Sequence, residues 1–159
     1  MLRRDYANIH QLSPESFEIF ICDRLDKMGL DVARVGSTYK PDGGVDIVAW
    51  PRKPAPFPFL LATQVKHHMR PSKKTGPDAV KDLQAVIASK PFHAGLLVTS
   101  TSFTPSAHWF AANHPHIIRL RDMKDLQRWI WNNFTDDEEW REIPSSIELA
   151  PGVNIKIDS

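Results

Sequence analysis

The chain has 159 residues, of which 42% are hydrophobic and 25% charged, a size and balance typical of one globular domain. Its 20 basic and 19 acidic residues give a net charge of +1, which neither requires nor excludes a nucleic-acid partner. No apolar run approaches the roughly 20 residues that cross a membrane, no secretory signal is recognisable, and the single cysteine excludes an internal disulfide, so we expect a cytoplasmic protein with no membrane partner.

The N-terminal half predicts one helix followed by three strands. Residues 1–12 are expected to be a short leader. Ser13 is a suitable N-cap, Pro14 suits the first helical position and Gly29 the C-terminal cap, so a helix is predicted over 14–28. The strands are predicted over 31–36, 45–50 and 59–66, with a turn at 37–44 and a proline-rich hairpin connection at 51–58. In the second strand, we expect Val45, Ile47 and Ala49 on one face.

From Pro77 onward, helical and strand patterns alternate, which is typical of a parallel sheet. The predicted elements are a helix over 78–90, a strand over 94–99, a helix opened by Thr104 and Pro105, a strand over 117–120 and a helix over 123–133. Residues 134–159 are expected to be a tail with a possible hairpin around Pro151 and Gly152. The order α-β-β-β-α-β-α-β-α predicts an α/β fold with a mixed central sheet flanked by helices.

Four polar residues on three of these elements are the candidate reaction centre. Asp46 follows two glycines where a turn meets a strand, and Gln64 and Lys66 lie two apart on the next strand. Side chains two apart share one face, so Gln64 and Lys66 emerge together while Val65 faces the opposite layer. If the two strands pair as a hairpin, Asp46 faces the same cleft, and a helix packed on the sheet adds Glu18.

These groups suit phosphodiester hydrolysis. Two carboxylates form a hard-oxygen site for Mg²⁺, with Mn²⁺ as a possible substitute, and such an ion stabilises transition-state charge and lowers the pKa of bound water. Lys66 can orient that water or stabilise developing negative charge, and the neutral Gln64 can orient water or contact the ion weakly. Loss of Asp46 is expected to abolish cleavage and leave stability nearly unchanged.

The same residues also have structural interpretations. Asp46 can cap a turn, and Gln64 and Lys66 can form a solvated strand face. Asp42 is interpreted as a turn residue, with an outer-shell contact to the site as the alternative, and Glu15 as a first-turn acid that stabilises the helix dipole.

A basic stretch follows the third strand. Its candidate DNA contacts are Lys66, His67, His68, Arg70, Lys73 and Lys74, and the alternative is an ordinary solvated loop. The histidines lack zinc-site spacing, and the hydroxyl residues at 99–102 are interpreted as a strand-to-helix turn, because no base is placed beside them. Trp109, Trp129 and Trp131 are expected in the core or at an interface, with base-stacking platforms as the less favoured alternative.

Four motifs in order carry a family resemblance. They are Ser13-Pro-Glu-Ser-Phe-Glu18, Asp42-Gly-Gly-Val-Asp46, Gln64-Val-Lys66 and Leu97-Val-Thr-Ser-Thr-Ser-Phe-Thr104. Over roughly residues 12–131, the chain resembles the Mrr-type restriction endonucleases, part of the PD-(D/E)xK nuclease superfamily in its D…QxK variant. The resemblance implies a restriction-endonuclease-like nuclease domain over 13–133.

The resemblance also implies roles for the site residues. Asp46 corresponds to the principal metal ligand, Lys66 to the catalytic lysine and Glu18 to the helix carboxylate that completes the site. Gln64 stands where most of the superfamily has an acid, and the Val65 carbonyl is expected to touch the metal. Mg²⁺ is the implied ion, double-stranded DNA the substrate, and defence against foreign or modified DNA the role.

Two departures from the family pattern concern target choice. The proline-rich stretch 51–58 lengthens the hairpin, and we expect no separate DNA-recognition domain, so a homodimer or a partner protein is expected to supply recognition. The alternatives are a catalytically weak DNA-binding or junction-resolving module, and a partner subunit whose nuclease site is vestigial.

Overall fold

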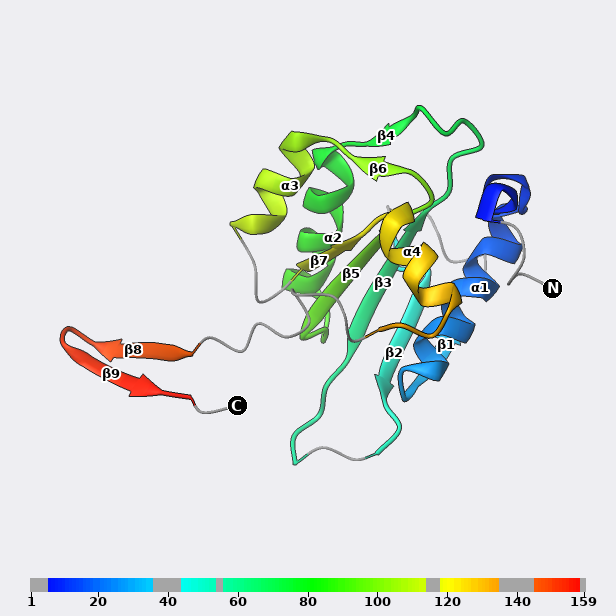
Figure 1. Cartoon of the computed structure of the whole chain (residues 1–159). Coiled ribbons are helices and arrows are strands. Elements are labelled where there is room, and N and C mark those ends of the chain that lie inside the picture. The colour runs from blue at the N-terminus through cyan, green and yellow to red at the C-terminus, as the bar shows by residue number, and fades with distance from the viewer. Residues whose placement is uncertain (1–5, 36–43, 54–55, 114–117, 135–144, 158–159) are drawn as a thin grey trace.

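A five-stranded mixed sheet lies between two layers of helices in the computed structural model, which describes residues 6–35, 44–53, 56–113, 118–134 and 145–157 (Figure 1). The strand order is β1-β2-β3-β5-β7, formed by β1 (Leu30–Arg34), β2 (Ile47–Pro51), β3 (Leu61–Lys66), β5 (Ala94–Thr99) and β7 (Ile118–Arg121). The first three strands pair antiparallel, whereas β5 pairs parallel with both β3 and β7. The predicted mixed sheet is confirmed.

The helices divide between the two faces of the sheet. They are the 3-10 helix η2 (Tyr6–Gln11) and the α-helices α1 (Pro14–Lys27), α2 (Pro77–Ser89), α3 (Pro105–Ala112) and α4 (Met123–Ile130). One buried cluster joins α1 and α4 to the sheet, and a second joins α2 and α3 to its other face. Ile9 of η2, a helix formed within the expected leader, is buried in the first cluster.

The sequence patterns located the main elements, with two errors. Val45 packs against the α2 and α3 layer, whereas Ile47 and Ala49 belong to the α1 and α4 cluster, because the regular strand begins only at Ile47. The last helix ends at Ile130, and Asn132 adopts a left-handed φ of 57° that cannot continue it. Most of the predicted turn at 37–44, including Asp42, lies outside the described residues.

Two short ladders lie apart from the main sheet. β4 (Lys74–Thr75) and β6 (Ser102–Phe103) pair in parallel and are too short for a periodic pattern to predict. β8 (Ser146–Ala150) and β9 (Val153–Lys156) form an antiparallel hairpin whose residues are exposed, and its turn contains Gly152 at a φ of 78°. Among the described helices, none combines the length and hydropathy that a membrane crossing needs.

Close packing of α2 on β5 depends on a glycine. A Cβ atom at Gly95 would meet Ile87 Cδ1 at 2.5 Å and Leu83 Cδ2 at 3.0 Å.

We predict that Gly95→Ala lowers the free energy of unfolding by about 1–3 kcal/mol through overpacking. Ile87→Val removes the clashing Cδ1 atom, so it should cost less in the Gly95→Ala background than in the parent. Urea unfolding of the four proteins of this cycle measures the coupling, and strictly additive effects would contradict the packing explanation.

The start of α4 contains an acid with a shifted pKa. Asp122 and Asp125 form a capping box, in which Asp125 Oδ2 accepts a hydrogen bond from the Asp122 amide at 2.8 Å. Burial raises the pKa of the Asp125 carboxyl from 3.8 to about 6, although this hydrogen bond opposes the shift. The folded protein therefore binds more protons than the unfolded chain between these values, so this group makes the fold less stable as pH rises through that window.

Replacing Asp125 tests this pH dependence. Asp125→Asn keeps an oxygen that accepts the hydrogen bond of the Asp122 amide, but its side chain cannot ionise. Between about pH 4 and pH 7 the parent should therefore lose stability relative to the variant. The expected loss is up to roughly 1.4 kcal/mol for each unit of pKa shift. Urea unfolding at several pH values measures the difference, with Asp82→Asn on the exposed face of α2 as the charge-matched control. A difference that stays constant with pH would rule out the buried carboxyl as its source.

Candidate active site

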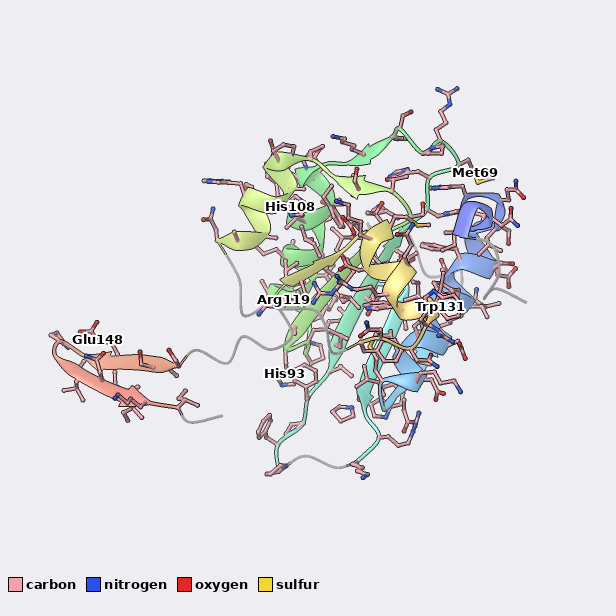
Figure 2. All side chains as sticks on the ribbon, in the orientation of Figure 1. Met69, His93, His108, Arg119, Trp131 and Glu148 are labelled. Carbon is pink, nitrogen blue, oxygen red and sulfur yellow. The ribbon has the colours of Figure 1, made fainter. Side chains whose placement is uncertain are left out.

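The predicted site residues gather at one end of the sheet. β3 ends at Lys66, β5 ends beside it at Thr99, and β2 starts at this end because it runs antiparallel to β3. Near the start of α1, the ring of Phe17 stacks on the ring of His67 with centroids 4.7 Å apart. This end carries η2 and β4 in Figure 1, and in Figure 2 it lies near Met69, opposite the end marked by His93.

The four α-helices of the described residues all begin at this end. α1 starts beside β3, and α2 starts directly after β4. The Thr104 amide at the start of α3 donates to the Thr75 carbonyl at 3.0 Å, and the Met123 amide at the start of α4 donates to the Thr101 carbonyl at 2.9 Å. The partial positive charges of the helix N-termini therefore add to the potential around the candidate site.

Asp46 is fixed between two strands by hydrogen bonds of its amide, its carbonyl and its carboxylate. Its amide donates to the Thr63 carbonyl at 2.9 Å, and its carbonyl accepts from the Val35 amide at 2.8 Å. Its carboxylate Oδ2 accepts from the Val65 amide at 2.7 Å, and the residue is only 5% exposed. The carboxylate thus reaches across to β3, where it meets the Gln64-Val65-Lys66 segment.

Gln64 and Lys66 share a face of β3, as predicted. Val65 packs against the α1 and α4 cluster, and Ala62 belongs to the α2 and α3 cluster, so alternation puts Gln64 and Lys66 on the latter side. Gln64 is 3% exposed, which excludes its interpretation as part of a solvated face. Lys66 is half-buried, and its carbonyl accepts the Ser100 amide at 3.1 Å.

Glu18 approaches this end from the other layer. It lies on α1, its side chain is 12% exposed, and its Oε2 accepts a hydrogen bond from Arg34 Nη2 at 3.3 Å. Arg34 ends β1, and the next residue, Val35, donates to the Asp46 carbonyl. The end of β1 therefore connects Glu18, through Arg34 and Val35, to Asp46. Glu18 lies in the α1 and α4 layer, whereas Gln64 and Lys66 face the α2 and α3 layer. Nothing in the sequence marks Arg34 as its partner.

Two histidines secure the segment after β3. His67 Nε2 donates to the Leu12 carbonyl at 2.7 Å, and His10 Nδ1 donates to the His68 carbonyl at 3.2 Å. Together with the stack of His67 on Phe17, these contacts hold η2 and the start of α1 against the residues that follow Lys66. His67 and His68 are both partly buried, and their contact with DNA stays a prediction.

The hydroxyl residues after β5 form a buried network that the sequence interpretation missed. The Oγ1 atom of Thr99 lies 2.9 Å from Thr75 Oγ1 and 3.3 Å from Thr101 Oγ1, and Thr75 Oγ1 lies 2.9 Å from His68 Nε2. Ser100 Oγ accepts the His68 amide at 2.8 Å. The run of threonines and serines at 99–102 was the available signal, and its role is to brace the segment after Lys66.

The electrostatic setting of this segment is cationic. Burial lowers the pKa of His68, and the charges of Lys73, His67 and Lys66 lower it further. Arg70, Lys73 and Lys74 are exposed to solvent. The residues predicted to contact DNA thus fall into two groups. Arg70, Lys73 and Lys74 are exposed cations, whereas His67 and His68 are partly buried and form hydrogen bonds that hold the loop.

The donor set suits a small, hard cation. Within the described ranges, no group of three or more His, Cys, Asp or Glu side chains is placed to hold a metal ion. A divalent ion at this end would therefore rely on Asp46, Glu18, backbone oxygen such as the Val65 carbonyl, and water. Mg²⁺ tolerates such a site because it usually keeps several waters, whereas structural zinc requires four protein ligands.

Comparison with solved structures supports the fold. The chain resembles the protein AF1548, of unknown function, with a TM-score of 0.54 and 17% identity over 70% of this chain and 59% of that one. It also resembles the MspJI restriction endonuclease, solved with a 27-mer oligonucleotide, with a TM-score of 0.56 and 19% identity over 80% of this chain and 29% of that one. It resembles the DNA modification-dependent restriction endonuclease AspBHI with a TM-score of 0.58 and 18% identity over 80% of this chain and 34% of that one.

These likenesses concern the fold alone, and the chain spans about a third of the length of the two nucleases and 59% of AF1548. No curated protein matches the sequence. A family model for the Mrr catalytic domain, described as restriction endonuclease, matches residues 9–130, most of the chain. Family match, fold and motif order agree: the chain belongs to the Mrr-type restriction endonuclease family.

Proposed function

We propose that this chain is the catalytic domain of a Mg²⁺-dependent endonuclease that hydrolyses phosphodiester bonds in double-stranded DNA. The observation that carries the proposal is the hydrogen bond of the Asp46 carboxylate to the Val65 amide. It holds an acid against the strand segment that presents Gln64 and Lys66. Mn²⁺, which shares the preference for oxygen ligands, is the proposed substitute ion.

The proposed roles follow from position. Asp46 and the Val65 carbonyl would hold the cation, Glu18 would reach it from the α1 layer at the same end of the sheet, and Gln64 would orient a water molecule. The bound ion supplies Lewis acidity and a water of lowered pKa. Lys66 holds its positive charge where the attacked phosphate gains negative charge, so that it favours the transition state over the ground state.

The basic segment after β3 suits the phosphate backbone. Arg70, Lys73 and Lys74 are exposed on the side of the candidate site, and the four helix N-termini add positive potential there. Such contacts bind DNA without reading its sequence, so we propose that a second copy or a partner protein supplies target recognition. Defence against foreign or modified DNA is the proposed role, by analogy with the modification-dependent nuclease AspBHI.

One contact favours a second candidate function. Glu18 is engaged by Arg34, so the site as it stands offers a paired rather than an open carboxylate. If that ion pair persists with metal present, the chain is a DNA-binding subunit with a vestigial site. Cleavage assays separate the two functions.

We predict that the chain converts supercoiled plasmid to nicked and linear forms in Mg²⁺ or Mn²⁺ and loses this activity in EDTA. Lys66→Ala should lower the rate by at least about 100-fold, because a charge positioned for the transition state is removed. Lys90→Ala, at the end of α2 away from the site, is the matched control and should cut like the parent. DNA binding without cutting in any metal would favour the vestigial site.

The Asp46 hydrogen bond changes the expected effect of removing this acid on stability. Asp46→Ala leaves the Val65 amide without its acceptor in a buried place, which should cost about 1–3 kcal/mol in the free energy of unfolding. Asp46→Asn retains an acceptor oxygen and should be markedly more stable than the alanine variant. Both should fail to cleave plasmid. Urea unfolding compares the three proteins, and equal stability of alanine variant and parent would show that the bond contributes nothing to the fold.

A further inference from the structure

A pocket between α2 and α3 lies beside the basic segment. Its volume is about 560 Å³, and it is lined by Pro77, Lys81, Pro105, Ser106, Trp109 and Phe110. Trp129 is fully buried, as expected of a core residue, but Trp109 is 64% exposed. The α2/α3 pocket therefore exposes a large indole ring to solvent, although this ring is not needed to fill the hydrophobic core.

The aromatic and cationic groups of this pocket are arranged together. Phe110 meets Trp109 edge-on, with centroids 5.7 Å apart and planes at 69°, and Lys81 Nζ lies 4.8 Å from the centroid of the Phe110 ring. Asp78 and Asp82 also lie on α2, but neither lines the pocket. The lining thus combines an exposed π face with a single positive charge, a combination that suits a planar group attached to an anion.

The pocket is held in a fixed position relative to the basic segment. Lys74 pairs with Ser102 in the β4–β6 ladder, and the Thr104 amide donates to the Thr75 carbonyl at 3.0 Å. Pro77 and Pro105, which open the two helices, follow this ladder directly and line the pocket. The ladder thus connects Lys74 to the helix starts that line the pocket, so that one DNA strand could contact both.

We propose that the α2/α3 pocket binds an unpaired nucleobase of the DNA strand that lies along the basic segment, with the base stacked on Trp109. Every base has a π face, so such stacking tolerates any sequence, and the neighbouring cations complement the phosphates. The charge beside the pocket favours nucleic acid over an apolar protein surface. The inference rests on the proposed function, since it takes DNA as the ligand.

The test compares DNA binding by the whole chain in EDTA, so that neither metal nor cleavage is involved. Fluorescence anisotropy is measured with a labelled duplex that has a single-stranded end and with a blunt duplex of the same sequence. Trp109→Ala should weaken binding of the first by about 5- to 150-fold and of the second far less, and Trp109→Phe should restore most of the loss. The matched control is Trp131→Ala, which removes a 58% exposed indole at the C-cap of α4 (Figure 2) and should leave both affinities unchanged.

Each alternative outcome is decisive. Equal loss for both duplexes, or no loss, would overturn the base-binding pocket. A variant that binds DNA like the parent but changes mass in sedimentation would instead identify the pocket as a contact between copies of the chain. If the parent binds the overhang through Trp109 yet never cuts plasmid, the pocket stands and the nuclease proposal fails. If the parent cuts plasmid but Trp109→Ala binds normally, only the pocket fails.

Discussion

The geometry of the candidate active site depends on one hydrogen bond, from the Val65 amide to the Asp46 carboxylate. An acid that is 5% exposed needs such a donor, because a buried charge without a hydrogen bond is costly. The regular β2–β3 ladder starts only at Ile47, one residue later, so the carboxylate itself extends the pairing of the two strands. Asp46 is thereby fixed relative to Gln64 and Lys66, which flank Val65, and the acid is at once a structural group and the proposed ligand.

The rest of the fold supports this contact from two sides. The apolar clusters on the two faces of the sheet hold the strands, and their fully buried side chains take no part in the proposed chemistry. At the end of the sheet the stabilising contacts are polar. His67, which follows β3, donates a hydrogen bond to the Leu12 carbonyl, and the hydroxyl groups of Thr75 and Thr99 brace the following loop. Stability and chemistry therefore occupy different parts of the molecule, joined at Asp46.

Local patterns in the sequence predicted local structure well. The apolar run at 94–99 is β5 itself, and the spacing of Gln64 and Lys66 correctly assigned them to one face. The layer from which Glu18 approaches was not predictable, because it is set by the face of the sheet on which α1 packs. Its partner Arg34 lies sixteen residues away on another element and was not predictable either. The hydroxyl network was missed for the same reason, because it is set by how distant segments pack, which periodicity does not report. The tryptophans were expected in the core or at an interface, and Trp129 is buried whereas Trp109 is exposed.

The common orientation of the helices has an electrical consequence. Because α1, α2, α3 and α4 all start at the end where β3 finishes, their peptide dipoles reinforce one another, although the net charge of the chain is only +1. The first-turn acids Glu15, Asp78 and Asp125 offset part of this potential at three of the four helices. The positive field is therefore confined to the end of the sheet, where it acts on an anion at close range.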